Sequence, residues 1–155
     1  MAATPVPHLN LHGQAREALE FYAAAFGGQA QIRTYGDFGM PAEAPDASKV
    51  VWGQVVAGDG FAIMAYDVPG ASDTAGLPGA ARREQGVTLT DQPVFLALNG
   101  STLEQATGWW TALGDGATVV EQLAASAWSA GFGMLTDRFG VTWAISVVAE
   151  APTGV

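Results

Sequence analysis

The chain has 155 residues, with 15 acidic and 6 basic side chains and a formal net charge of −9. Nucleic-acid phosphates and anionic membrane surfaces would repel this charge, so we expect neither as a partner. The lack of cysteine excludes disulfide scaffolds, thiolate nucleophiles and thiolate zinc sites. No apolar run reaches membrane-spanning length and the N-terminus has no signal-peptide pattern, so we expect a cytoplasmic protein.

The first half of the chain reads as a strand, a helix and three strands. A strand-like segment at residues 6–11 precedes apolar residues at helical spacing over residues 14–26, and Gly27-Gly28 ends this helix. Three further strands are predicted at residues 30–35, 50–57 and 61–66, and Gly58-Asp59-Gly60 joins the last two as a hairpin.

The second half repeats this order. A strand at residues 94–98 precedes a capping box, Ser101 to Glu104, and a helix that ends before Gly114. Strands follow at residues 117–122, 132–136 and 141–148. Leu11 matches Leu98, Phe21-Tyr22 matches Trp109-Trp110, and Gly60 matches Gly140.

The repeat predicts an α+β fold of two tandem βαβββ modules, residues 1–67 and 93–149, within a single domain of residues 1–155. Residues 68–92 begin rich in proline and glycine, and we predict a linker long enough to carry one module across to its partner. The charged fraction of 14% is low and the hydrophobic fraction is 49%, which favours a homo-oligomer with surface buried between subunits.

Four segments of the chain resemble the PhnB-like branch of the vicinal oxygen chelate superfamily, which includes glyoxalase I and bleomycin-resistance proteins. They are residues 7–11 (PHLNL), residues 15–22 (AREALEFY) with Phe26-Gly27-Gly28, residues 58–64 (GDGFAIM), and Trp128 with residues 132–143 (FGMLTDRFGVTW). The resemblance covers nearly the whole chain. It implies two mixed sheets curled around a concave cavity, with the helices outside, and two chains associated side by side as a homodimer.

Alternation along the strands assigns side chains to this cavity, because neighbouring residues point to opposite faces. If Leu9 and Leu11 pack under the first helix, His8 and Asn10 face the cavity, and the resemblance favours the same side for Trp52. An apolar, aromatic pocket with a few polar groups is typical of a small-molecule site. The candidate ligand-binding residues are His8, Asn10, Trp52, Gln54, Met64, Tyr66, Phe95, Trp128 and Phe132.

Each candidate also has a structural interpretation. Trp128 and Phe132 could instead be core or dimer-interface aromatics. His8 could act as a general base or metal ligand, or be a hydrogen-bonded structural histidine. Asn10 and Gln54 either bind the polar edge of a ligand or satisfy backbone groups. We predict Arg82-Arg83 to be a solvated loop, with contact to an anionic ligand as the alternative.

Metal-dependent relatives, as the resemblance implies, place four ligands on the first and last strands of each module. Direct carry-over puts these positions at Pro7, Met64, Pro93 and Ala144, and a slip of one residue brings His8 near the first. None of the four coordinates a hard divalent ion. We therefore predict neither a metal site nor a cofactor, with a divalent metal as the alternative.

The favoured function is a homodimeric small-molecule-binding protein, or an enzyme working without metal, that encloses a small, partly aromatic organic ligand. No catalytic residue is identified. The alternative is a metal-dependent lyase, isomerase or dioxygenase of the glyoxalase type. A purely structural dimer is the third interpretation.

Overall fold

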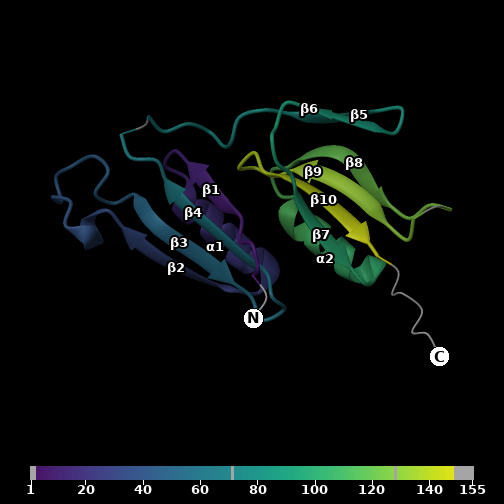
Figure 1. Cartoon of the computed structure of the whole chain (residues 1–155), viewed down its shortest axis with the longest axis horizontal. Helices are drawn as coiled ribbons and strands as arrows, with labels where there is room; N and C mark the ends of the chain where they lie inside the picture. The colour runs from purple at the N-terminus through teal and green to yellow at the C-terminus, as the bar shows by residue number, and fades with distance from the viewer. Residues whose placement is uncertain (1–2, 71, 128, 149–155) are drawn as a thin grey trace. The chain divides into compact units, whose positions relative to one another are not determined.

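Two units with the same order of elements make up the chain in the computed structural model, which describes residues 3–70, 72–127 and 129–148. The first unit is Met1–Leu77 and the second is Pro78–Val155. Each contains a four-stranded mixed sheet with one α-helix (Figure 1). None of the described helices is both long and apolar enough to span a membrane.

The first unit contains one four-stranded sheet in the order β1-β4-β3-β2, in which β1 and β4 run parallel and the other pairs are antiparallel. The helix α1 contacts all four strands from one side. Its elements are β1 (His8–Leu11), α1 (Ala15–Phe26), β2 (Gln29–Thr34), the 3₁₀ turn η1 (Gly36–Phe38), β3 (Val50–Val56) and β4 (Ala62–Asp67).

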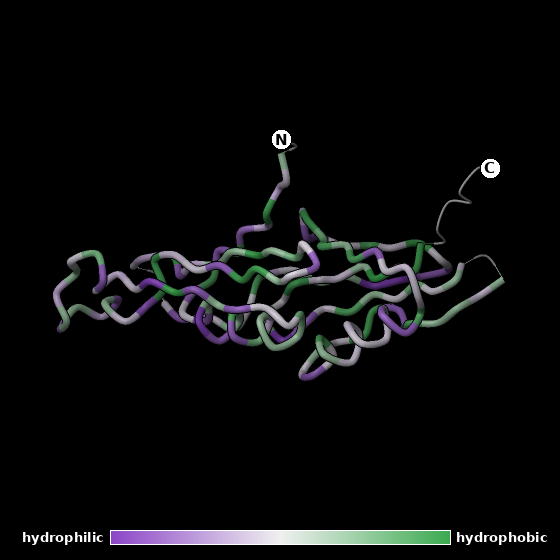
Figure 2. Tube along the Cα trace, turned by 90° about the horizontal axis from the view of Figure 1, so that it is seen from below, coloured by the Kyte–Doolittle hydropathy of each residue, from purple (hydrophilic) through white to green (hydrophobic). Residues whose placement is uncertain are grey.

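The core of this unit lies between α1 and the sheet. The helix buries an apolar stripe that includes Leu19 and Tyr22, and the strands bury Leu9, Leu11 and Ile63 against it. Short runs of hydrophobic and hydrophilic residues alternate along the strands (Figure 2). Neighbouring side chains of a strand point to opposite faces of the sheet, so one face is buried against the helix and the other is more polar.

A buried carboxylate fixes the start of α1. The Oδ1 atom of Asp67 accepts hydrogen bonds from the backbone N–H groups of Gly13 (2.8 Å) and Ala15 (3.0 Å), and Oδ2 accepts one from Val50 (2.9 Å). Asp67 is the last residue of β4 and is 2% exposed. The predicted strand ends one residue earlier, at Tyr66, because an aspartate after an apolar run is typical of a turn.

The second unit repeats the topology with the sheet order β7-β10-β9-β8, in which β7 and β10 are the parallel pair. The prediction of two βαβββ modules in an α+β fold is thereby confirmed. The elements are β5 (Ala81–Glu84), β6 (Val87–Thr90), β7 (Leu96–Gly100), α2 (Leu103–Leu113), β8 (Thr118–Ala124), β9 (Phe132–Thr136) and β10 (Thr142–Val147).

The repeat extends to the hydrogen bonds of the last hairpin in each module. The N–H of Ala57 donates to Phe61 O at 2.9 Å, and that of Asp137 donates to Val141 O at 2.8 Å. Gly60 and Gly140 both have positive φ, at 94° and 83°, as the sequence match predicts. The first strands match differently: Leu9 pairs with Ala65 as Leu98 pairs with Ile145, so Leu98 corresponds to Leu9 rather than to Leu11.

The segment predicted as a linker contains an antiparallel hairpin, β5–β6. Its two turn residues, Gln85 and Gly86, have positive φ values of 51° and 77°. The predicted linker contains no strand, although Val87-Thr88-Leu89-Thr90 alternates as a strand does.

The start of α2 also differs from its prediction by one residue. Thr102, not Ser101, is the N-cap: its Oγ1 accepts from Gln105 N at 3.1 Å. The side-chain oxygen of Gln105 in turn accepts from Ser101 N at 3.0 Å. Gln105 thus takes the place predicted for Glu104, but its side chain accepts from the residue before the N-cap rather than from the N-cap N–H of a standard capping box.

Candidate functional site

Six of the predicted ligand-binding residues lie on one face of the first sheet, the face turned away from α1. We call this surface the far face. On β1, Leu9 and Leu11 are buried under the helix while His8 and Asn10 are exposed on the far face. The same alternation on β3 and β4 places the other side chains there. The six residues are His8, Asn10, Trp52, Gln54, Met64 and Tyr66.

Strand register makes these residues neighbours. Met64 lies directly beside His8 on one side and Gln54 on the other. Gln54 in turn pairs with Gln31 of β2. A continuous row of three polar side chains and one thioether therefore crosses all four strands, and it forms the centre of the far face.

The next row brings a cation to the face. Asn10 pairs with Tyr66, and Trp52 pairs with Arg33 of the edge strand β2. Gln31 and Arg33 were absent from the predicted site. The signal was available in the alternation of the strand: Ile32 pairs with Gly53, which faces Leu19 of α1, so the two neighbours of Ile32 point to the far face.

The side chain of His8 is held by two neighbours. Its Nδ1 lies 3.1 Å from Asn10 Oδ1, and its ring contacts Tyr66 edge-on with centroids 5.4 Å apart. If Nδ1 donates to the amide oxygen, the neutral ring leaves Nε2 as an acceptor. His8 is thus both anchored and able to accept a proton or a hydrogen bond.

A hollow of about 660 Å³ lies at the β2 edge of the first unit. Its lining includes Trp52, Gln31, Arg33 and Arg16. Nearby, the Tyr35 hydroxyl donates to Asp67 O at 2.7 Å. Burial raises the pKa of Tyr35, and the negative charge of Asp67 raises it further, so this phenol stays neutral and acts as a donor.

The second sheet has a far face of its own, and the β5–β6 hairpin covers part of it. Met134 pairs with Ala144 as Gln54 pairs with Met64, so Met134 is the counterpart of Gln54. Gln54 is half-buried, whereas Met134 is only 2% exposed. The hydroxyl of Thr88 on the hairpin lies 3.7 Å from Met134 Sδ.

Phe132 lies under this cover. The guanidinium carbon of Arg83 is 5.1 Å from the centre of the Phe132 ring. Phe95 immediately precedes β7 and is half-buried, and Trp128 lies outside the described residues. The prediction of a solvated Arg82-Arg83 loop is wrong, because both residues belong to β5 and Arg83 is half-buried against the sheet.

Arg83 uses only part of its hydrogen-bonding capacity. Its Nη1 donates to Thr88 Oγ1 at 2.8 Å, but its buried Nε forms no hydrogen bond with any acceptor in the described part of the chain. A carboxylate oxygen, Glu121 Oε2, is 3.5 Å from Nε. A buried donor without an acceptor costs roughly 1–3 kcal/mol. A pocket of about 480 Å³ adjoins it, with Glu121, Ser126, Ser129 and Phe132 among its lining.

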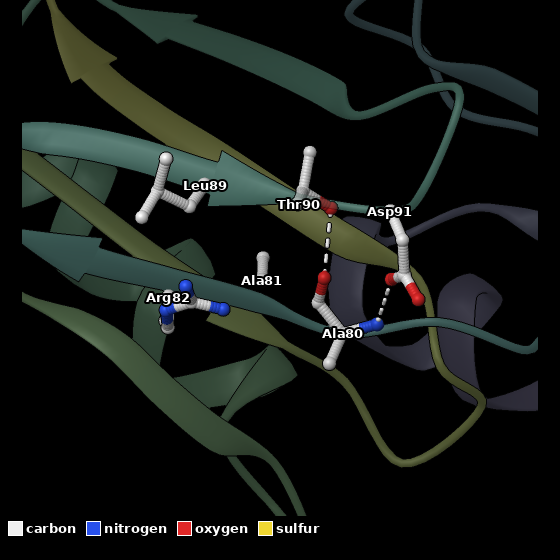
Figure 3. A pocket seen from close by; sticks show the side chains of 6 residues that line it. All are labelled: Ala80, Ala81, Arg82, Leu89, Thr90 and Asp91. Carbon is white, nitrogen blue, oxygen red and sulfur yellow. Dashed lines mark hydrogen bonds between the residues drawn. The ribbon is translucent and has the colours of Figure 1, made fainter.

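A smaller hollow of about 390 Å³ lies at the base of the hairpin, between Ala80 and Asp91 (Figure 3). Its polar groups bind one another: Asp91 Oδ1 accepts from Ala80 N at 2.7 Å, and the Thr90 hydroxyl donates to Ala80 O at 2.8 Å. These bonds close the hairpin.

The positions that the resemblance implies for a metal do not carry a suitable donor set. These positions are Pro7, Met64, Pro93 and Ala144, of which only Met64 has a side-chain donor atom, a thioether. The register of the first sheet places His8 beside Met64, which adds one imidazole, and hard divalent ions prefer oxygen ligands. Within residues 3–70, 72–127 and 129–148, no three His, Asp or Glu side chains gather closely enough to hold an ion.

Comparison with known proteins finds a protein family that matches most of this chain. Residues 8–145 match the model of the Glyoxalase/Bleomycin resistance protein/Dioxygenase superfamily. Protein YjdN from Escherichia coli is 25% identical over 151 residues, which cover 95% of this chain and 97% of YjdN.

Solved structures share the fold. Protein PA1353 from Pseudomonas aeruginosa is 29% identical, with a TM-score of 0.73 over 96% of this chain and 100% of that chain. The PhnB protein from Bacillus cereus is 19% identical, with a TM-score of 0.65 over 94% of this chain and 100% of that chain. This second likeness is one of fold alone.

Proposed function

Because the chain belongs to the glyoxalase/bleomycin resistance protein/dioxygenase superfamily, we propose that it binds a small, partly aromatic organic molecule on the far face of the first sheet. One observation carries this proposal. Side chains from β1, β3 and β4 lie together on that face, and they combine two aromatic rings with an imidazole and two amides. Such a mixture is typical of small-molecule sites.

The chemistry of binding divides between rings and polar groups. Trp52 and Tyr66 offer faces for an aromatic ligand, and each aromatic pair contributes about 0.5–1.5 kcal/mol beyond the burial of area. His8 and Gln54 orient the polar edge of the ligand. Sequestration of a ligand needs nothing more, and metal-free catalysis would use the free nitrogen of His8 as a general base.

Two further parts of the proposal concern the assembly and the second unit. We propose a homodimer, supported by the low charged fraction of 14%. Phe95 and Phe132 are proposed as ligand contacts of the second unit. The donor set at Pro7, Met64, Pro93 and Ala144, with His8 beside Met64, gives no support to the metal-dependent lyase, isomerase or dioxygenase alternative.

The test is a thermal-melting screen of the whole chain against aromatic antibiotics and small aromatic metabolites. A ligand that binds only the folded state at 100 times its Kd adds about 2.7 kcal/mol of stability. We expect Trp52→Ala and His8→Ala to reduce the shift produced by a hit. His12→Ala is the matched control, because this second histidine follows β1 and lies outside the candidate set.

Two outcomes contradict the proposal. One is a screen in which no compound raises the melting temperature. The other is a hit whose shift is the same in Trp52→Ala, His8→Ala and the unmodified chain, which would locate binding elsewhere.

A further inference from the structure

We propose that the second unit holds a site for the carboxylate of an aromatic acid, built by Arg83 beside Phe132. The site uses Phe132, which is also a proposed ligand contact of the second unit, but it shares no residue with the far face of the first sheet and does not depend on the ligand proposed there. It assigns a binding partner to an arginine that sequence alone places in a solvated loop.

The two adjacent arginines of the hairpin have different surroundings. Arg82 Nε pairs with Glu84 Oε1 at 2.8 Å, and both side chains are largely exposed. Arg83 points the other way, as alternation along a strand requires, and its side chain is only 20% exposed. Arg83 is therefore the arginine that the fold desolvates, and desolvation strengthens its attraction for an anion.

The guanidinium of Arg83 is incompletely satisfied. Thr88 accepts from Nη1, while no acceptor among the described residues meets hydrogen-bond geometry with the Nε donor. Glu121 Oε2 lies 3.5 Å away and offers charge but no hydrogen bond. A carboxylate suits the planar set of guanidinium donors, because its two oxygens accept from two guanidinium N–H groups at once.

Glu121 is then a competitor of the ligand. Its side chain is 46% exposed, so it can turn toward water when an external carboxylate approaches Arg83. Its negative charge also opposes the incoming anion. Removal of this charge is expected to tighten binding.

The pocket beside Arg83 suits the rest of an aromatic acid. The Phe132 ring and the methyl group of Ala124 form apolar lining, and Ser126 and Ser129 add hydroxyl groups. The two serines form a turn in which Ser129 N donates to Ser126 Oγ at 3.2 Å. The volume of about 480 Å³ falls in the range of small-molecule sites.

The experiment titrates the whole chain at constant ionic strength with benzoate, with benzamide as its neutral match and with cyclohexanecarboxylate as its non-aromatic match. Calorimetry gives the Kd. We expect benzoate to bind tightest, and Arg83→Gln to weaken it by about tenfold or more, the scale of a charge-assisted hydrogen bond. Arg82→Gln is the matched control and leaves the benzoate Kd unchanged. Glu121→Gln tightens it a few-fold.

Arg83→Lys separates recognition from folding. Lysine keeps the charge and the aliphatic stem but lacks the planar set of guanidinium N–H donors. We therefore expect this variant to bind benzoate more weakly. We expect its melting temperature to equal that of the unmodified chain. The proposal is overturned if benzoate binds no better than benzamide, if Arg82→Gln weakens binding as much as Arg83→Gln, or if Glu121→Gln leaves the Kd unchanged. Failure here is distinct from failure of the first-sheet site, whose ligand shift depends on Trp52.

Discussion

Single buried carboxylates organise the loops of both units. Asp67 accepts three backbone N–H groups in the first unit. Asp137 accepts from Phe139 N and Val141 N through Oδ1, and from Trp143 Nε1 through Oδ2 at 2.8 Å. Each side chain gathers donors that would otherwise be buried without partners.

We expect Asp67→Asn to lower the free energy of unfolding by about 2–4 kcal/mol, because an amide supplies one acceptor oxygen and turns its NH₂ toward backbone donors. Urea denaturation measures the change. Asp59→Asn is the control: this exposed carboxylate accepts one bond, from Phe61 N at 3.0 Å, and should cost less than about 1 kcal/mol. Equal losses from both substitutions would contradict this account.

The stability of the first unit should depend on acid through Asp46. A hydrogen bond from the backbone of Gly70, together with Lys49, lowers the pKa of Asp46 from its ordinary value of 3.8. The unfolded chain then binds the proton more readily, so this stabilisation is present above pH 3.8 and is lost as pH falls below it. We expect Asp46→Asn to flatten the dependence of the urea midpoint between about pH 2 and 5. A urea midpoint that falls with acid as steeply in Asp46→Asn as in the unmodified chain would contradict this account.

At the scale of elements, the β5–β6 turn contains a correctable strain. A two-residue hairpin with positive φ at both positions favours Asn-Gly, and Gln85 occupies the asparagine position with φ 51°. We expect Gln85→Asn to raise the free energy of unfolding by about 0.5–1 kcal/mol. Gln85→Val should lower it. The melting temperatures of the unmodified chain, Gln85→Asn and Gln85→Val test this expectation. It is contradicted if the valine variant is as stable as the asparagine variant.

Helix–sheet contact in each unit depends on a glycine at the same place in β3 and β9. A Cβ on Gly53 would collide with Leu19 of α1, and one on Gly133 would lie 2.8 Å from the Trp110 ring of α2. We expect Gly133→Ala to cost about 1–3 kcal/mol by overpacking. Gly108→Ala has the opposite expected sign, a gain of about 1 kcal/mol, because Gly108 is inside α2 with open space around it. Chemical denaturation of both variants tests the contrast.

Much of the element order could be predicted because its signals are local. The stripe of α1 and the matching glycines at 60 and 140 need only their neighbours in sequence. Alternation likewise placed His8 and Asn10 on the correct face. The N-cap of α2 was missed by one residue because Ser101 and Thr102 are both good caps, and only the extended backbone of Thr102 (φ −136°) decides between them.

The cover of Phe132 could not be predicted in this way. It depends on contact between residues far apart in sequence, such as Thr88 with Met134. Periodicity within one strand carries no information about what lies over its face. The same limit applied to Asp67, whose partners Gly13 and Val50 come from distant segments.

At the scale of the whole molecule, we expect the chain to elute as a homodimer. Light scattering coupled to gel filtration should give twice the mass of a single chain at micromolar concentration. A single-chain mass that persists as the concentration rises would contradict the dimer, and the first-sheet proposal would then rest on one protomer alone.

In each module, the strand made first pairs with the strand made last: β1 with β4, and β7 with β10. On a ribosome, His8–Leu11 must therefore wait for Met64–Asp67 to emerge before its sheet can close. The first module can therefore close while the second is still being made. Slow closure of such distant pairs is expected to limit the folding rate, and synthesis presents the modules to that step one at a time.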